Sequence, residues 1–348
     1  MFKLANYVAA GRYMSGGVFG IGSNQVFIDD KNEWETIVKV SSLIKEFTSL
    51  EQLTKSVASH YPSINESSVS SIVSFLEENN FLIRNYSFDK DDRFSRNKLY
   101  YNFLGSNPDD FQKNISNSVV TVIGCGGIGN HIAYMLATSG VAKIILVDDD
   151  YIEISNLTRQ VLFTESDVGK NKVDILEREL KKRNSDVEIE TIAKAVTSPG
   201  DIRNLEPSDL YVISADYPSD LMFWVNEACV EKEQPFVNVG YINDISLIGP
   251  FYIPQKTACF ACQQVTPKSK DAEILTNELA NIHSDFKPCT FPSVNGVAAS
   301  YALGDIIKFL GGKGEINSAN KRIGIHSMKP EIEIQDMALN PGCSVCAV

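Results

Sequence analysis

The sequence lacks an excess of positive charge and has no long apolar run. Its 32 lysines and arginines stand against 44 aspartates and glutamates, which gives a net charge of −12. Binding to nucleic-acid backbones needs clustered lysine and arginine, so we expect no nucleic-acid partner. Aliphatic runs such as Ile144–Val147 fall far short of the roughly 20 apolar residues that span a bilayer, so we also expect no membrane partner.

The first residues lack a basic stretch followed by a continuous apolar core, which is the pattern of a secretion signal. We therefore expect a cytoplasmic, reducing location. The seven cysteines, an odd number, then indicate metal-binding, catalytic or buried thiols rather than disulfides. A length of 348 residues with 43% apolar and 22% charged residues excludes wholesale disorder and is typical of two globular domains.

The N-terminal region predicts a small helical domain. Its glycines at 11–23 are not followed by Gly-Lys-Ser/Thr, which argues against a phosphate loop. Amphipathic patterns predict helices at Glu33–Phe47 and Leu50–His60, then a third helix with Asn65 as N-cap and a short strand at 81–83. This order indicates a winged-helix-like unit. The third helix has no lysine or arginine, so peptide binding is favoured over DNA binding, and a purely structural cap remains an alternative.

Residues 85–98 are polar and predict a linker, so we divide the chain into domains at 1–88 and 89–348. Strand and helix patterns then alternate, which predicts an α/β, Rossmann-like fold with a mostly parallel sheet. The predicted strands are Val119–Ile123, Lys143–Val147, Val187–Ile192, Leu210–Ser214, Phe236–Val239 and Ile245–Ile253. The predicted helices between them are His131–Ser139, Lys172–Arg183 and Leu221–Glu231.

A glycine-rich loop with the pattern G-x-G-x-x-G follows the first of these strands and opens a helix. Such a loop lets phosphate groups approach the backbone at a helix N-terminus. The candidate nucleotide-binding glycines are Gly124, Gly126, Gly127 and Gly129. Asp148 ends the next strand and is placed to bind a ribose hydroxyl, and Asp150 follows in the same acidic run. These features alone are compatible with NAD or FAD, and also with a turn that binds no ligand.

The segment after Asp148 favours ATP. Asn156, Arg159 and Lys172 follow the second strand, and cations at this place stabilise the charge of a triphosphate and of leaving pyrophosphate. A dehydrogenase has no need of them, so an NAD-dependent oxidoreductase is the alternative from a different class. For Arg159 and Lys172 taken singly, a solvated helix face is the other reading.

Two C-x-x-C pairs predict a metal site. They are Cys259 with Cys262 and Cys343 with Cys346, and 80 residues separate the pairs. Four thiolates form the tetrahedral set that structural zinc prefers. We expect one closed, structural zinc site, with a redox C-x-x-C as the alternative. Of the remaining cysteines, Cys289 stays open as a candidate for a thioester-forming residue.

The stretch from Gly124 to Lys172 resembles the E1-like (ThiF/MoeB-type) adenylating superfamily. The resemblance implies that Asp148 binds ribose and that Asn156, Arg159 and Lys172 serve ATP binding and catalysis. It further implies that Asp216 is catalytic and holds Mg²⁺, and that the enzyme is a homodimer. Arg96, in the R-x-x-R pattern of residues 93–96, would then reach the partner subunit's ATP. The cofactors implied are ATP, Mg²⁺ and Zn²⁺.

Within this superfamily the chain resembles the adenylyltransferases of microcin C biosynthesis, which join a peptide clamp to an E1-like domain. The similar segments include 124–131, 156–163, 167–172, 182–185 and 322–325. The resemblance implies that a carboxylate of a short ribosomally made precursor peptide is adenylated in antibiotic biosynthesis. The alternatives are a pantocin-like enzyme that activates glutamate side chains, a sulfur-carrier-protein adenylyltransferase and a non-catalytic peptide-binding partner. The identity of the peptide and the fate of the acyl-adenylate stay open.

Overall fold

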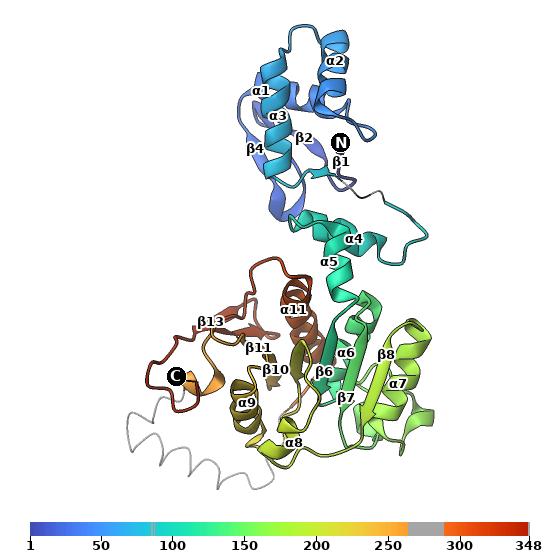
Figure 1. The fold of residues 1–348 in the computed structure, drawn as a ribbon, viewed down its shortest axis with the longest axis vertical. Helices are drawn as coiled ribbons and strands as arrows, with labels where there is room; N and C mark the ends of the chain where they lie inside the picture. The colour runs from blue at the N-terminus through green and yellow to red at the C-terminus, as the bar shows by residue number, and fades with distance from the viewer. Residues whose placement is uncertain (85, 87, 264–288, 347–348) are drawn as a thin grey trace. The chain divides into compact units, whose positions relative to one another are not determined.

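The computed structural model describes residues 1–84, 86, 88–263 and 289–346. The chain forms two compact units, Met1–Lys113 and Asn114–Val348 (Figure 1). This division lies later in the chain than residue 88, because Asn102 of helix α4 (Ser95–Phe103) donates a hydrogen bond to Tyr7 of the first unit. The linker predicted at 85–98 is therefore wrong at its end, where α4 begins. The functional boundary at residue 88 stays a prediction.

The first unit has three helices around one apolar core. They are α1 (Lys31–Ser41), α2 (Leu50–His60) and α3 (Glu66–Glu78), followed by α4 and by α5 (Pro108–Ile115). The N-cap predicted for α3 is confirmed, since the Asn65 side chain accepts the N–H of Ser68 at 2.9 Å. Helix α1 ends earlier than the predicted Phe47, because Ser42 caps it.

Two small sheets complete the first unit. Strands β2 (Ala10–Tyr13), β3 (Gly16–Phe19) and β4 (Val26–Ile28) form an antiparallel sheet, and β1 (Lys3–Leu4) pairs with β5 (Leu82–Ile83). The glycines at 11–23 thus lie in a hairpin region. The winged-helix-like comparison for this unit stays a prediction.

The second unit confirms the predicted α/β class. Its sheet has eight strands in the order β13-β12-β11-β10-β9-β6-β7-β8, and the pairs from β10 to β8 are parallel. The parallel strands are β6 (Val119–Ile123), β7 (Lys143–Val147), β8 (Glu188–Ile192), β9 (Leu210–Ile213) and β10 (Phe236–Ile242). Antiparallel strands β11 (Ile245–Tyr252), β12 (Lys321–His326) and β13 (Ile332–Asp336) extend it.

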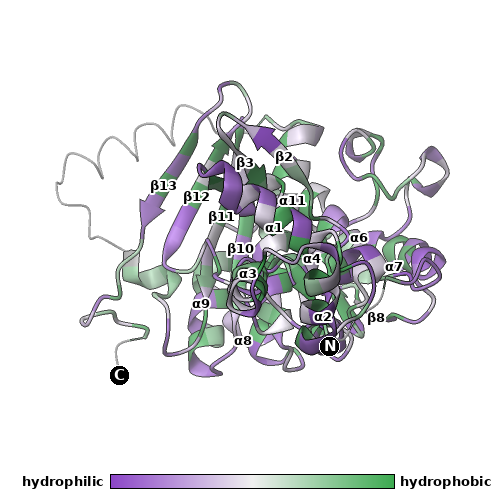
Figure 2. Ribbon diagram, turned by 90° about the horizontal axis from the view of Figure 1, so that it is seen from above, coloured by the Kyte–Doolittle hydropathy of each residue, from purple (hydrophilic) through white to green (hydrophobic). Residues whose placement is uncertain are grey.

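Helices cover both faces of this sheet (Figure 1). Helix α6 packs against α7 and α11, whereas α8 packs against α9. These helices are α6 (Gly127–Ser139), α7 (Lys172–Arg183), α8 (Pro199–Arg203), α9 (Leu221–Glu231) and α11 (Pro292–Gly311). At the free edge, β13 is exposed along its length and largely hydrophilic (Figure 2). No helix among the described residues is long and apolar enough to span a bilayer.

Candidate nucleotide and metal sites

A cavity of about 830 Å³ opens at the carboxyl ends of strands β6, β7, β9 and β10. The chain proceeds from β6 to β7 and β8 on one side, then returns to β9 and β10 on the other side of β6. Ligands of open α/β sheets bind where the strand order reverses in this way. The volume also falls within the roughly 300–1,000 Å³ of small-molecule sites.

Three of the predicted glycines shape the loop that forms one wall of the cavity. Gly124 has a φ of +91°, in the left-handed region that side chains disfavour. A Cβ on Gly129 would collide with the carbonyl oxygen of Gly124, and one on Gly127 would collide with Asn295. Gly124 and Gly127 line the cavity, whereas Gly129 does not and serves close packing.

Gly126 differs from the other glycines because it faces open space. Among the described atoms, the nearest to a Cβ at this position is Nε2 of Gln160, at 4.0 Å. Gly126 is the N-cap of α6, so the unpaired N–H groups of the first turn begin here. A phosphate can approach this backbone without meeting a side chain, which is the fit that ATP requires.

Asp148 follows β7 and is fixed by the backbone. Its Oδ2 accepts the N–H of Cys125 at 2.6 Å, and its Oδ1 accepts the N–H of Asp150 at 2.9 Å. Burial raises the pKa of Asp148, although the nearby Lys172 and the two N–H groups oppose the change. Each carboxylate oxygen keeps a free lone pair, so the side chain can still accept a ribose hydroxyl.

Lys172 is the first residue of α7 and is held by Asp150. Its side chain is 7% exposed, and its Nζ donates to Oδ2 of Asp150 at 2.6 Å. The ammonium has two further N–H donors for a phosphate. Asp150 lines the cavity as predicted for a nucleotide-binding residue, but its contact in the structure is the Lys172 ammonium. Asp150 is therefore placed to hold that cation in position, and its predicted contact with the nucleotide stays a prediction.

Asn156 and Arg159 lie on the long connection between β7 and α7, residues 148–171, at the cavity wall. Asn156 ends a 3₁₀ turn at Ile154–Asn156, and its Oδ1 accepts the N–H of Glu153 at 3.1 Å. Arg159 is half-buried and donates to the carbonyl of Ser155 at 3.0 Å. Four guanidinium N–H groups remain for other acceptors, since arginine has about five donors.

Asp216 lies beyond the end of β9 on the cavity wall and is exposed. Its carboxylate makes no hydrogen bond or ion pair to any residue that the structure describes. A free carboxylate beside a phosphate site can coordinate Mg²⁺, whose preferred ligands are oxygens.

Arg96 belongs to the first unit, on α4, and its guanidinium lies 5.3 Å from the Phe88 ring centroid. Its predicted role stays a prediction.

Several cavity residues have no role in the sequence prediction. They are Gln160, Lys194, Asn238, Tyr241, Asn295 and Arg322. Two of them have a polar atom that indicates a missing ligand: Oε1 of Gln160 and Nε of Arg322 are buried without a hydrogen-bond partner among the described residues. Arg322 lies within one of the segments quoted for the family resemblance, but that segment carried no indication of a cavity.

The structure brings together the four cysteines predicted to bind zinc. All four sulfurs lie within 4.8 Å of one another. Adjacent Sγ–Sγ distances are 3.7 Å for Cys259–Cys343, 3.9 Å for Cys259–Cys262 and 3.4 Å for Cys262–Cys346. A tetrahedral zinc with Zn–S bonds of about 2.3 Å places its sulfurs roughly 3.8 Å apart, so the cluster fits this metal.

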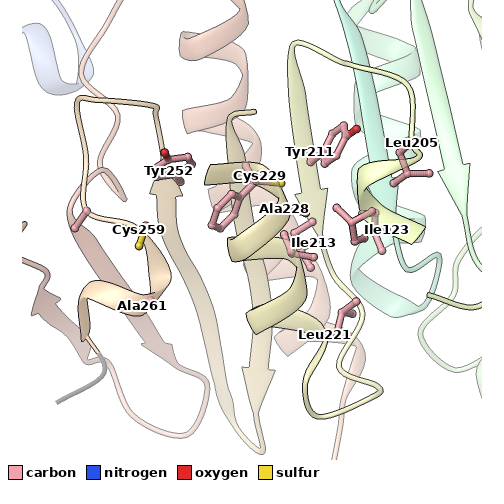
Figure 3. Close-up of a cluster of buried hydrophobic side chains, with 14 of the residues drawn as sticks. Ile123, Leu205, Tyr211, Ile213, Leu221, Ala228, Cys229, Tyr252, Cys259 and Ala261 are labelled. Atoms are coloured by element: carbon pink, nitrogen blue, oxygen red, sulfur yellow. The ribbon is translucent and has the colours of Figure 1, made fainter. Parts of the chain in front are cut away.

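The cluster is closed, as a structural metal site requires. Cys259 is buried in the core that also holds Tyr252 of β11 and Ala228 and Cys229 of α9 (Figure 3). Burial raises the pKa of Cys343, but the N–H groups of Cys346 and Val345, together with hydrogen bonds to the Cys346 and Cys259 thiols, outweigh it and lower the pKa to about 7. These N–H groups favour a thiolate, which is the form that binds zinc.

The other three cysteines lie outside the cluster. Cys125 and Cys229 are buried. Cys289 is exposed, and its Sγ lies 3.3 Å from Oδ1 of Asn243. Nothing in the described residues around Cys289 indicates a nucleophile.

Comparison with known proteins extends over the whole chain. The crystal structure of E. coli MccB with ATP matches with a TM-score of 0.91 and 42% identity, covering 99% of each chain. The microcin C7 biosynthetic enzyme MccB in complex with N-formylated MccA matches equally, with a TM-score of 0.91, 42% identity and 99% coverage of each chain.

The chain matches less than two thirds of the length of the curated relatives. Ubiquitin-like modifier-activating enzyme 5 of Branchiostoma floridae is 28% identical over 250 residues, which span 67% of this chain and 59% of the relative. The profile of the ThiF family matches residues 100–345, a range that contains the cavity loops and three of the four clustered cysteines, and ends one residue before Cys346. The glycine loop, the cavity at the strand reversal and this match agree, and the chain belongs to the ThiF family.

Proposed function

We propose that this chain is an ATP-dependent adenylyltransferase that activates a carboxylate of a short, ribosomally made precursor peptide. The observation that carries the proposal is the cavity, which combines an open glycine at a helix N-terminus, an acid anchored for a ribose, and cations that keep N–H donors for a phosphate. Support for the peptide comes from MccB, which is 42% identical over the whole chain and was crystallised with ATP and with MccA.

The proposed reaction follows from the placement of these groups. A carboxylate oxygen of the peptide attacks the α-phosphorus of ATP and forms a new P–O bond. The bond between the α-phosphorus and the bridging oxygen breaks, and pyrophosphate leaves with its electron pair. The products are an acyl-adenylate and pyrophosphate. No protein nucleophile is required, so orientation and charge stabilisation supply the catalysis.

Each cavity residue has a distinct task in this proposal. The backbone at Gly126 binds phosphate oxygens, and Asp148 binds the ribose. Arg159 and Lys172 stabilise the negative charge that moves onto pyrophosphate, while Asp150 orients Lys172. A magnesium ion held at Asp216 would supply further positive charge to the phosphates.

We further propose that the N-terminal domain binds the peptide and that two copies form a homodimer. The likeness to MccB extends over the first unit and supports a peptide-binding role for it, and the homodimer is what the resemblance to the E1-like superfamily implies. In such a dimer Arg96 of one copy would reach the ATP of the other. The product peptide would enter microcin C-like antibiotic biosynthesis in the cytoplasm.

The test is ATP–pyrophosphate exchange by the purified chain, with MccA as the first peptide. We expect exchange that requires both the peptide and its free carboxylate, and a mass increase of one adenylate group when pyrophosphate is removed. A peptide amidated at its C-terminus is the matched control. Exchange without peptide, or reduction of NAD without exchange, would contradict the proposal.

A further inference from the structure

Arg322 lines the cavity with an unsatisfied cationic side chain. It lies near the start of β12 and is partly buried, and its Nε is buried without a hydrogen-bond partner among the described residues. The structure gives it no ion pair to any described acid. Burial lowers the pKa of this guanidinium. A buried cation without a counter-charge is unfavourable, so such a residue is expected where an anionic ligand supplies the missing charge.

The strand register shows which part of the cavity Arg322 serves. Ile323 of β12 is level with Ile248 of β11, which is level with Val239 of β10. Strand β10 runs parallel to β9, and its Asn238 is level with Ile213, the last residue of β9. Measured along the strand direction, Arg322 is therefore nearly level with the end of β9, a few residues before Asp216.

The surface between Arg322 and β10 is shallow. Gly324, Leu247 and Gly240 are level across the three strands, and alternation along β12 places Arg322 on the same face as Gly324. A Cβ on Gly240 would meet no described atom within 4 Å. Helix α11 covers the opposite face, since Ser246 beside Leu247 donates to the carbonyl of Val294 at 2.7 Å. The sheet thus leaves room for an extended peptide on this face.

The cations of the cavity are divided between its two ends. Arg159 and Lys172 come after β7, at the end of the cavity with the glycine loop, and Lys194 follows the neighbouring strand β8. These three cations are placed to serve the phosphates. Arg322 lies on β12, two strand spacings or about 10 Å from β10. An arginine side chain is long enough to cover most of that distance. Its planar fork matches a carboxylate with two parallel hydrogen bonds.

We propose that Arg322 binds the peptide carboxylate that is to be adenylated and holds it over β10, facing the α-phosphate of ATP. The proposal rests on the proposed function and adds the residue that recognises the reacting group. Arg322 would then determine that the enzyme accepts an acid and rejects the corresponding amide. It would act on peptide binding and leave ATP binding unchanged.

The experiment compares Arg322→Gln and Arg322→Lys with the unaltered protein in exchange assays using MccA. We expect Arg322→Gln to raise the KM for MccA by at least about 30-fold and to change the KM for ATP less than about 3-fold, since a bidentate charged contact is lost on one substrate. Arg322→Lys keeps the charge but loses the fork, so its KM for MccA should be intermediate. Lys321→Gln, at the neighbouring position on the other face of β12, should change neither constant.

A binding readout without turnover separates recognition from catalysis. Calorimetric titration should show that the unaltered protein binds MccA more tightly than MccA amidated at its C-terminus, and that Arg322→Gln binds both peptides alike. A rise in the KM for ATP instead would assign Arg322 to the phosphates and overturn the proposal. So would a lower Tm with both KM values unchanged, since Arg322 would then be structural. If the unaltered protein neither binds MccA nor exchanges, the proposed function itself fails.

Discussion

The cysteine cluster and the nucleotide cavity lie in the same unit, but they differ in whether their polar side chains have partners. In the cluster, each sulfur has the other three within 4.8 Å, and Cys259, Cys262 and Cys343 are buried. In the cavity, Asp216 and the Nε of Arg322 have no partner among the described residues. A complete set of ligands stabilises the fold, whereas an incomplete set is available to a substrate. The comparison therefore assigns structure to one region and chemistry to the other.

Removing a zinc ligand is expected to have the largest effect on the fold. Cys259→Ser should lower the zinc content below one per chain and reduce the Tm by about 10 °C, because metal binding is coupled to folding. Elemental analysis and calorimetry measure the two quantities. The exposed Cys289→Ser is the matched control and should keep both. Full zinc content in Cys259→Ser would remove the structural role.

Removing the free carboxylate of the cavity should reduce the exchange rate and leave the Tm unchanged. Asp216→Asn should slow ATP–pyrophosphate exchange by about 100- to 1,000-fold, the range for loss of one electrostatic group that acts in the transition state. Its Tm should stay unchanged, because Asp216 has no partner to lose among the described residues. Asp336→Asn, on the exposed strand β13, is the control for a surface carboxylate. A retained exchange rate would withdraw the assignment.

Asp167 lies in the same connection between β7 and α7 as Asn156 and Arg159, and its carboxylate is fully hydrogen-bonded. It therefore provides a contrast to the carboxylate of Asp216, which has no partner among the described residues. Burial alone would raise its pKa, but hydrogen bonds from Thr164, Arg178 and Lys170 hold the pKa well below its usual range. A lowered folded-state pKa contributes stability above the unfolded-state value of about 3.9 and loses it as the pH falls toward the folded-state pKa.

Asp167→Asn should therefore lower the free energy of unfolding by about 2 kcal/mol at pH 7, because it removes the charge of a buried carboxylate that Thr164 and two partly exposed cations, Arg178 and Lys170, satisfy. The difference from the unaltered protein should shrink as the pH is lowered below about 4, where the aspartate begins to protonate in the unfolded chain. Urea unfolding of both proteins, from pH 7 to below about pH 4, measures this difference in the free energy of unfolding. A difference that is constant with pH would contradict the ion-pair explanation.

The glycine loop allows the smallest and most selective test. Gly126→Ala places a methyl group in the cavity, so the KM for ATP should rise about tenfold, or about 1.4 kcal/mol, with little change in Tm. Gly129→Ala places the same methyl group against the Gly124 carbonyl and should reduce the Tm first. If both variants lost stability equally, the loop would have no separate ligand-facing position.

Much of the cavity could be predicted because its glycine loop and Asp148 directly follow short, mostly apolar strands. Val119–Ile123, Lys143–Val147 and the helix at Lys172–Arg183 have the predicted bounds, so the loops after them could be assigned correctly. The paired C-x-x-C spacing similarly predicted which sulfurs meet. Local sequence is sufficient where one element and the adjacent loop determine the geometry.

The remaining features depend on contacts between distant segments. Helix α11 was not predicted, because it packs against α6 on one side and β10 and β11 on the other, and this double burial weakens its helical periodicity. In the sequence, Arg322 is indistinguishable from an exposed cation on a strand. Its place at the cavity depends on the pairing of β12 with β11. The burial of a charge is a tertiary property, and pattern alone does not reveal it.

The spacing of the clustered cysteines has a consequence for chain entropy. A bound metal would close a loop of 80 residues between Cys262 and Cys343, and this loop contains both Asn295 and Arg322 of the cavity. Such a closure restricts the unfolded chain far more than the folded one. A metal bound at the cluster would thus hold the far wall of the cavity in place, and loss of zinc should weaken peptide binding before it weakens binding of the ribose.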